Sequence, residues 1–149
     1  MTMLKVIKLG IANSKSQTIE EVSQVEALSG KGLVGDRHFR ESNSIRSQIT
    51  LIESENVDYY NYKFKTNYKY TEFRRNVVTK GIELNGLVGK ELLIGKVKVK
   101  GHDLCRPCKH LEETLKGRAI IKEFLRKGGL RCEILVSGQI NLHDDIKII

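Results

Sequence analysis

The sequence lacks any apolar run near the ~20 residues that a membrane-spanning helix needs, so we expect no membrane contact. Its N-terminus, MTMLKVIKLGIANSK, lacks the long apolar stretch and the cleavage site of a signal peptide, which predicts a cytoplasmic location. Cysteine is scarce. Three cysteines, an odd number in a chain without a secretion signal, argue against a disulfide framework.

The 149 residues are 30% charged and 40% hydrophobic, a balance typical of a soluble globular protein, and we predict one domain covering residues 1–149. The net charge of +8 is compatible with simple solubility or with an anionic partner, either nucleic acid or a phosphorylated small molecule. The chain has no Lys/Arg run of five or more and no basic–glycine–aromatic signature of RNA stacking. We therefore do not expect nucleic acid as the partner.

Short β segments dominate the pattern along the chain. Residues 4–12, 47–53, 76–84, 90–95, 96–104 and 130–149 are rich in β-branched and apolar residues. The stretch KVKVK alternates strictly, which predicts one buried and one solvated face. Residues 54–65 predict a short helix, and residues 110–129 predict an amphipathic helix broken near Gly117. Many short strands with few helices indicate a β-barrel rather than alternating β and α units.

The segment VKGHDLCRPCKHLEE, residues 99–113, concentrates residues that can carry chemistry. Its possible metal ligands are His102, Cys105, Cys108 and His110. A zinc site would lack a second, distant ligand pair, and four ligands within nine residues are cramped for a tetrahedral geometry. A dithiol redox pair usually stands in a βαβ setting, which the strand-rich sequence upstream does not supply.

A thiolate that holds a cofactor fits this segment better. Cys108 follows Pro107 and precedes Lys109 and His110, where a helix is expected to begin. Nearby cations and the positive end of a helix favour the ionised sulfur, which is a soft metal ligand. The competing interpretation is that Cys105 and Cys108 are small buried hydrophobic residues. For the third cysteine, which lies within the apolar alternation of LRCEILV, we expect burial.

Four segments in this order resemble the MOSC domain family, named for the C-terminal domain of molybdenum cofactor sulfurase. They are GLVGDRHF, SQITLIE, FRRNVVTKGIELNGLVGKELLIGKVKVKG and CRPCKHLE, between about residues 30 and 112, and the tail GGLRCEILVSGQINLHDDIKI is similar to the family's closing strands. The resemblance implies a mainly β fold, a closed, mostly antiparallel β-barrel of the pyruvate-kinase-barrel-like type with a few short helices. It also implies binding of the molybdenum cofactor (molybdopterin), with the family's cysteine falling on Cys108 as metal ligand.

A phosphorylated pterin needs cations and hydrogen-bonding groups, and the motifs contain both. The candidates for the phosphate are Arg37 in GDRH, Arg74 and Arg75 in FRRN, and Lys109. Asn76 is predicted either to hydrogen-bond the pterin edge or to cap a turn, and Asp36 either to contact the pterin or to orient its neighbouring arginine and stabilise the glycine turn. His110, and with less support His38, is a candidate for moving protons.

Two functions from different classes follow from the resemblance. The first is a molybdenum-dependent oxidoreductase that reduces small N-hydroxylated compounds, with Cys108 and His110 as catalytic residues and a partner reductase as electron donor. The second is a non-catalytic carrier of cofactor or sulfur, using a Cys108 persulfide supplied by a sulfur-donor protein. A zinc-containing nucleic-acid binder is a third, weaker alternative that predicts binding with a steep salt dependence.

Overall fold

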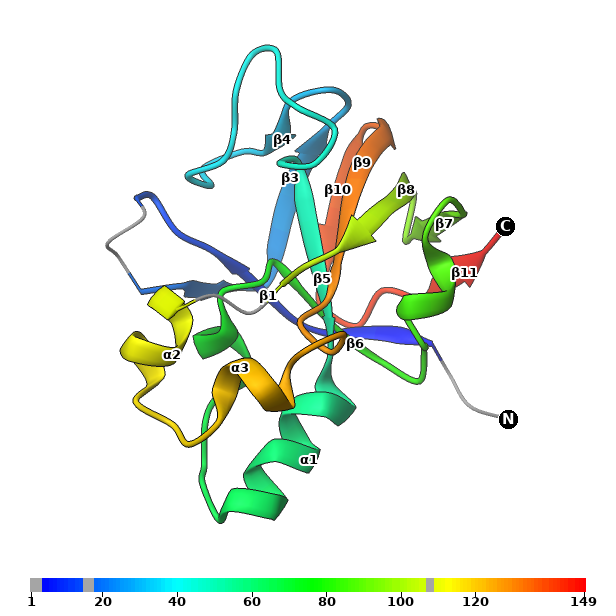
Figure 1. Ribbon diagram of the computed structural model, residues 1–149. Helices are drawn as coiled ribbons and strands as arrows, with labels where there is room; N and C mark the ends of the chain where they lie inside the picture. Colours follow the sequence, from blue (N-terminus) through cyan, green and yellow to red (C-terminus); the bar gives the residue numbers. More distant parts are fainter. Residues whose placement is uncertain (1–3, 15–17, 107–108) are drawn as a thin grey trace.

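The computed structural model describes residues 4–14, 18–106 and 109–149, in which short strands alternate with a few short helices (Figure 1). The strands in the described residues are β1 (Lys5–Ile11), β2 (Glu20–Val22), β3 (Gln24–Leu28), β4 (Gly32–Leu33), β5 (Ile49–Glu53), β6 (Val77–Lys80), β7 (Glu91–Ile94), β8 (Val97–Leu104), β9 (Leu130–Val136), β10 (Gly138–Asn141) and β11 (Ile146–Ile148). The helices are α1 (Ser54–Phe64), α2 (Lys109–Leu115) and α3 (Ile120–Glu123), with the 3₁₀ helices η1 (Tyr70–Phe73) and η2 (Asn85–Leu87). The prediction of a mainly β protein with few short helices is confirmed.

The strands form two sheets. The larger has the order β11-β7-β8-β9-β5-β6-β1-β2, and the smaller has the order β10-β3-β4. All ladders are antiparallel except that of β5 and β6, which are parallel and joined through α1. The predicted closed barrel is not confirmed in the described residues, because β3 and β10 pair with each other in a second sheet instead of joining the short edges β2 and β11. Backbone hydrogen bonds still link β1 to residues 143–146, from Val6 N to the Asp144 carbonyl (2.9 Å) and from Ile146 N to the Leu4 carbonyl (2.8 Å).

Alternation places the larger hydrophobic core between the sheets. On β8, Val97, Val99 and Gly101 are buried while Lys98 and Lys100 are partly exposed, as the KVKVK pattern predicts. On β9, the residues Leu130, Cys132 and Ile134 are likewise buried. Burying a Val or Leu side chain of this kind stabilises a fold by about 1.5–3 kcal/mol, so the inward face of each strand fixes its register.

The helices lie together at one end of the sheets (Figure 1) and cover a second, aromatic core. The predicted helix over 110–129 is broken as expected: α2 ends at Leu115 and α3 begins at Ile120. Two tyrosines occupy the break, with the Tyr60 hydroxyl donating to the Arg118 carbonyl (2.7 Å) and the Tyr68 hydroxyl to the Leu115 carbonyl (2.6 Å). The Tyr68 bond satisfies a carbonyl at the end of α2 that has no partner within the helix, and the Tyr60 bond holds the link between α2 and α3. None of the helices described is long and apolar enough to cross a membrane.

Gly129 determines how the chain enters β9. Its φ is +112°, and a Cβ at this position would lie 2.0 Å from the Leu51 carbonyl oxygen, so only glycine fits. The Gly129 carbonyl accepts a hydrogen bond from Cys105 N (2.8 Å). This contact fixes the chain just after β8, at the first cysteine of the segment 99–113, which we call the cysteine segment.

Candidate functional site: an arginine-lined cleft

A cleft of about 540 Å³ opens where five parts of the chain meet. These parts are the residues after β1, the turn that follows β4, the link between η1 and β6, the end of the segment after β8 together with α2, and the start of β9. The described residues that line the cleft are Asn13, Ser14, Arg37, His38, Arg40, Arg74, Arg75, Arg106, Leu111 and Arg131. Six arginines with no carboxylate among these lining residues make a concentrated positive field, which favours an anionic ligand.

Arg37, one of the predicted phosphate ligands, is largely enclosed. Its side chain is 12% exposed, and Nη1 lies 3.7 Å from Asp36 Oδ1 but has no hydrogen-bond partner among the described residues. Burial lowers the pKa of Arg37; the Asp36 carboxylate opposes that effect, and Arg74 and Arg75 add to it. A buried guanidinium nitrogen without an acceptor is costly, and a bound oxyanion would supply the missing acceptor.

Arg74 and Arg75 both line the cleft because they do not lie on a strand. On a strand, adjacent side chains point to opposite faces, and we expected one arginine to face away in that case. Arg74 instead ends η1 with a left-handed φ of 64°, which changes the chain direction before β6 begins. Arg75 Nε donates to the Gly128 carbonyl (2.8 Å), which holds its guanidinium in place.

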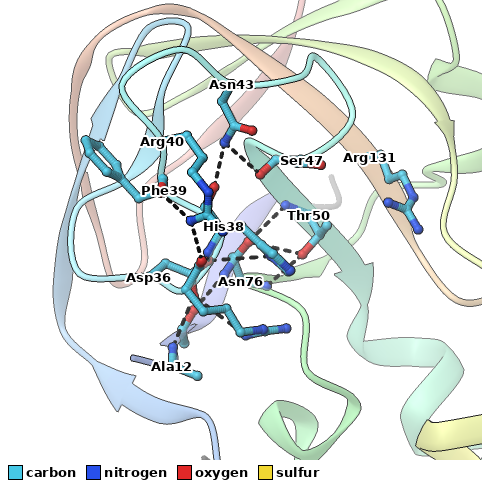
Figure 2. Close-up of polar contacts among 12 residues, drawn as sticks. Ala12, Asp36, His38, Phe39, Arg40, Asn43, Ser47, Thr50, Asn76 and Arg131 are labelled. Carbon is cyan, nitrogen blue, oxygen red and sulfur yellow. Dashed lines mark hydrogen bonds and ion pairs between the residues drawn. The ribbon is translucent and has the colours of Figure 1, made fainter. Parts of the chain in front are cut away.

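Asp36 is buried and joins the turn after β4 to the end of β1 (Figure 2). Its Oδ1 accepts a hydrogen bond from Ala12 N (3.1 Å), and its Oδ2 accepts one from His38 N (3.4 Å). Both carboxylate oxygens are thus used to hold the turn, which agrees with the structural alternative that we gave for this residue. A contact between Asp36 and the cofactor stays a prediction.

Asn76 is also buried, at the start of β6, and links three strands (Figure 2). Its Oδ1 accepts hydrogen bonds from Thr50 N and from the Thr50 hydroxyl, both 3.1 Å long. Its Nδ2 donates to the Gly10 carbonyl (3.1 Å), so the amide connects β5 to β1. With these bonds the side chain has one donor proton left, and binding the pterin edge stays a prediction.

His38 lines the cleft with 49% of its side chain exposed, and its Nδ1 lies 3.8 Å from Asp36 Oδ2. Burial and the charge of Arg37 lower the pKa of His38, and the Asp36 carboxylate opposes them only in part. The ring is therefore neutral near pH 7, which suits hydrogen bonding better than proton donation.

The described part of the cysteine segment does not form a zinc site. Cys105 is buried beside two cleft arginines: burial raises the pKa of its thiol, and Arg75 and Arg131 oppose that rise. His102 Nε2 lies 2.9 Å from Glu133 Oε1, which occupies one ring nitrogen. Among the side chains that the structure describes, which do not include those of Cys108 and His110, no group of three His, Cys, Asp or Glu could hold a metal.

Cys132 is buried in the larger core, as predicted, and burial raises the pKa of its thiol. Cys108 lies outside the described residues, so its role as metal ligand stays a prediction. Lys109 and His110 open α2, but their side chains are not described, and their predicted roles are equally untested. Arg106 and Leu111, which flank this stretch in the sequence, both line the cleft.

Sequence reasoning missed three of the six cleft arginines. Arg131 could have been found, because strand alternation places it opposite the buried Cys132 on β9. Arg40 donates from Nη1 to the carbonyls of Arg37 (2.9 Å) and Phe39 (2.7 Å), a local turn arrangement without a sequence signature. Arg106 lies between the two cysteines of CRPC, a segment that we interpreted for its thiols and histidines and not for its arginine.

The structure defines the class of this protein as a mainly β domain with an arginine-lined cleft. The MOSC domain matches residues 33–147, and the chain belongs to this family. In structure it is similar to the YuaD protein from Bacillus subtilis, with a TM-score of 0.84 and 20% identity over 99% of this chain and 96% of that one. It is also similar to YiiM from Geobacillus stearothermophilus, with a TM-score of 0.79 and 14% identity over 98% and 75% of the two chains.

YiiM from Escherichia coli gives a TM-score of 0.68 and 16% identity over all of this chain and 70% of that one. No curated protein matches the sequence. At these identities the likeness to the solved structures shows the fold alone.

Proposed function

We propose that the arginine-lined cleft binds the molybdenum cofactor by its phosphate and that the protein reduces small N-hydroxylated compounds. The observation that carries the proposal is Arg37 Nη1, buried without a hydrogen-bond acceptor at the side of a cleft lined by five further arginines. Family membership supports the same cofactor.

The residues present fit a phosphorylated pterin. Guanidinium groups form bidentate hydrogen bonds with phosphate oxygens. We assign Arg37, Arg74 and Arg75 to the phosphate. Leu111 supplies an apolar wall on the α2 side for a flat ring. The volume of about 540 Å³ lies within the range of small-molecule sites. Cys108 is the proposed molybdenum ligand, and Lys109 a further phosphate ligand.

The reaction is a two-electron reduction of an N–O bond. An N-hydroxylated compound R–NHOH takes up two electrons and two protons, its N–O bond breaks, and R–NH₂ and water leave. The bound cofactor would supply the two electrons, which a reductase partner restores. The protein holds the phosphate with its arginines and provides protons. His110 is our candidate for the proton donor, because the lowered pKa of His38 leaves that ring with little of the protonated form that could donate.

Molybdenum content and turnover test the proposal together. The protein is isolated from a host that makes the cofactor, and molybdenum per chain is measured with benzamidoxime reduction by an artificial electron donor. Wild type is expected to hold about one molybdenum per chain and to turn over, whereas Cys108→Ala loses both. Cys132→Val is the matched control, because that thiol is buried in the larger core away from the cleft lining. Equal metal in wild type and Cys108→Ala would contradict the role of Cys108.

A sulfur carrier is the second candidate, and one observation favours it. The Cys105 thiol lies beside Arg75 and Arg131, whose positive charges oppose the rise in its pKa that burial causes. A persulfide on Cys108 could then be passed onward from the positively charged cleft, after loading by a sulfur-donor protein. Cyanide-releasable sulfur that is lost in Cys108→Ala, without turnover of N-hydroxylated compounds, would favour the carrier over the reductase.

A further inference from the structure

Three of the residues that line the cleft lie on one long loop. The segment between β4 and β5, residues 34–48, is described throughout, contains no helix or strand, and carries Arg37, His38 and Arg40. We call it the β4–β5 loop; Figure 1 shows it in cyan, projecting past β3 and β4. A loop of this length without regular structure samples several conformations unless side chains hold it. The shape of the cleft therefore depends on what holds this loop.

The side chain of Asn43 holds the β4–β5 loop together. Its Nδ2 donates to the carbonyls of His38 (2.6 Å) and Lys31 (2.8 Å) and lies 3.3 Å from the Ser47 carbonyl. Figure 2 shows the contacts of this amide within the loop. An amide nitrogen carries two protons, so the two shorter contacts are the stronger hydrogen bonds. One half-buried side chain thus joins the early part of the loop, its last part and the turn between β3 and β4.

The backbone of Asn43 is itself fixed to both sheets. Its N–H donates to the Gly30 carbonyl (3.0 Å), in the turn that follows β3 of the smaller sheet. Its carbonyl accepts a hydrogen bond from Gln48 Nε2 (3.4 Å), and Gln48 is buried. Gln48 Oε1 in turn accepts the N–H of Ile134 (2.9 Å), which lies on β9 of the larger sheet. The strands therefore set the position of Asn43, and Asn43 passes that position on to the loop.

Arg37 lies between two anchors of the β4–β5 loop. On one side its own N–H donates to the Ala12 carbonyl (2.6 Å), just after β1. On the other side Asn43 holds the carbonyl of His38, the next residue. The Arg37 carbonyl also accepts a hydrogen bond from Arg40 Nη1 (2.9 Å). Asn43 is not among the described residues that line the cleft, so its effect on a bound anion passes through the loop.

We infer that Asn43 is a positioning residue for the cleft, because it holds the β4–β5 loop in the conformation that presents Arg37 to an anion before the anion binds. The inference rests on the proposed binding of a phosphate in the cleft. A loop that must be ordered during binding lowers the affinity, and a loop that is ordered beforehand avoids that loss. Without the two donors of Asn43, the backbone at His38 loses its anchor, and Arg37 faces the cleft only part of the time.

Binding of inorganic phosphate to the full chain, made in a host without the cofactor, tests this role. Inorganic phosphate stands in for the phosphate of the cofactor, and its dissociation constant is measured by NMR titration. Asn43→Ala is expected to weaken binding about tenfold, because the loop must then be ordered by the ligand. Equal affinity in wild type and Asn43→Ala, or no phosphate binding by the wild type, would overturn the inference.

Asn61→Ala is the matched control, since Asn61 holds another loop in the same manner. Its Nδ2 donates to the Tyr68 carbonyl and its Oδ1 accepts the Tyr68 N–H, both at 3.0 Å, and it does not belong to the described lining of the cleft. The control is expected to bind phosphate within about twofold of wild type. Equal weakening in Asn43→Ala and Asn61→Ala would mean that any loss of a loop anchor weakens binding, which overturns the specific role of Asn43.

A double variant distinguishes positioning from general stabilisation. If Asn43 acts through Arg37, removing its donors from a chain that already lacks this guanidinium has little further effect. Arg37→Gln alone is expected to weaken phosphate binding about tenfold, and adding Asn43→Ala to it changes the dissociation constant by no more than about twofold. Losses that multiply in the double variant would show that Asn43 acts independently of Arg37 and would overturn the inference.

Amide relaxation in the wild type provides a measurement that does not depend on the folding of any variant. The backbone amides of His38 and Arg40 are expected to be as rigid as those of β5 without phosphate, and to stay so with it. A loop that becomes rigid only after phosphate is added would contradict the inference.

Molybdenum content separates this inference from the proposed function. If the phosphate and relaxation results are as expected but protein from a host that makes the cofactor holds no molybdenum, the role of Asn43 stands and the proposed function fails. If that protein holds molybdenum but Asn43→Ala binds phosphate as tightly as wild type, the role of Asn43 is overturned and the proposed function stands.

Discussion

The polar residues of GDRH and RRN separate into two regions with opposite properties. Asp36 and Asn76 are buried, and their side-chain oxygens accept hydrogen bonds from the surrounding backbone. Arg37 and Arg75, each next to one of them in sequence, face a cleft in which like charges gather. Residues adjacent in sequence thus have different roles. Asp36 and Asn76 hold β1, β5, β6 and the turn together, and Arg37 and Arg75 add positive charge to the cleft. A cluster of like charges is the feature from which we proposed binding of an anion, whereas a network with satisfied hydrogen bonds indicates a structural role.

The largest effect is expected from breaking the satisfied region. Asn76→Ala leaves Thr50 N and the Gly10 carbonyl without the partners they have at 3.1 Å. Each of these two buried groups that loses its partner costs about 1–3 kcal/mol, so the free energy of unfolding should fall by about 2–6 kcal/mol in urea denaturation. A loss below about 1 kcal/mol would show that the Asn76 network is not what holds these strands.

Arg37→Gln should preserve the stability of the fold and weaken cofactor binding. It removes a charge that burial and two neighbouring arginines disfavour, so the stability of the cofactor-free protein is expected to be unchanged or higher. Cofactor occupancy should fall about 10- to 100-fold, since a charge-assisted hydrogen bond contributes about 1.5–3 kcal/mol. Molybdenum and pterin per chain are the measurements, with Arg118→Gln as control because Arg118 lies over the Phe64 ring, 5.2 Å from its centroid, and does not line the cleft. Equal losses in both variants would mean that overall charge, not the cleft, governs binding.

Cys105 and Cys132 should make the free energy of unfolding depend on pH in the alkaline range. Burial raises the pKa of both thiols, so they stay neutral when folded but ionise when unfolded above the ordinary thiol pKa of about 8.5. The stability they contribute is present below that pH and is lost as pH rises toward the folded pKa, by about 1–2 kcal/mol between pH 8.5 and 10. Cys132→Ala should have a flatter profile over this range in denaturant titrations. An unchanged slope would contradict the burial of this thiol.

His38 should give the smallest effect. Its pKa is lowered in the folded protein, so the unfolded chain binds the proton more readily and stability falls as pH drops below about 6.5. Half of the side chain is in water, which screens the effect to well under about 1 kcal/mol. His38→Gln should remove this part of the acid profile, measured by thermal unfolding between pH 5 and 7. A steeper profile in the variant would mean that another group determines the acid response.

Much of the fold could be predicted from local pattern. The KVKVK alternation, the helix broken near Gly117 and the burial of Cys132 each depend on nearby residues and simple periodicity. The division into two sheets could not be predicted, because the pairing of β3 with β10 joins residues more than a hundred positions apart. Pairing over such a distance depends on the whole chain and leaves no local signal.

The cleft arginines that belong to a recognisable sequence motif could be predicted. Those that only the fold brings into the cleft could not. Arg37, Arg74 and Arg75 lie within recognisable motifs, but that both members of the FRRN pair face the cleft depends on the left-handed turn at Arg74. Arg40 and Arg131 reach the cleft from a loop and a strand that are distant in sequence. The roles of Asp36 and Asn76 needed the structure, since the same residue types serve equally as ligands and as turn-stabilising groups.

The most direct test of the account is a crystal structure of the protein isolated from a host that makes the molybdenum cofactor, with molybdenum located by its anomalous scattering. The account predicts phosphate oxygens within hydrogen-bond distance of Arg37 Nη1 and of Arg74 or Arg75, and the metal bound by the Cys108 sulfur. A cofactor bound elsewhere, or a cleft whose arginines contact no part of it, would contradict the account.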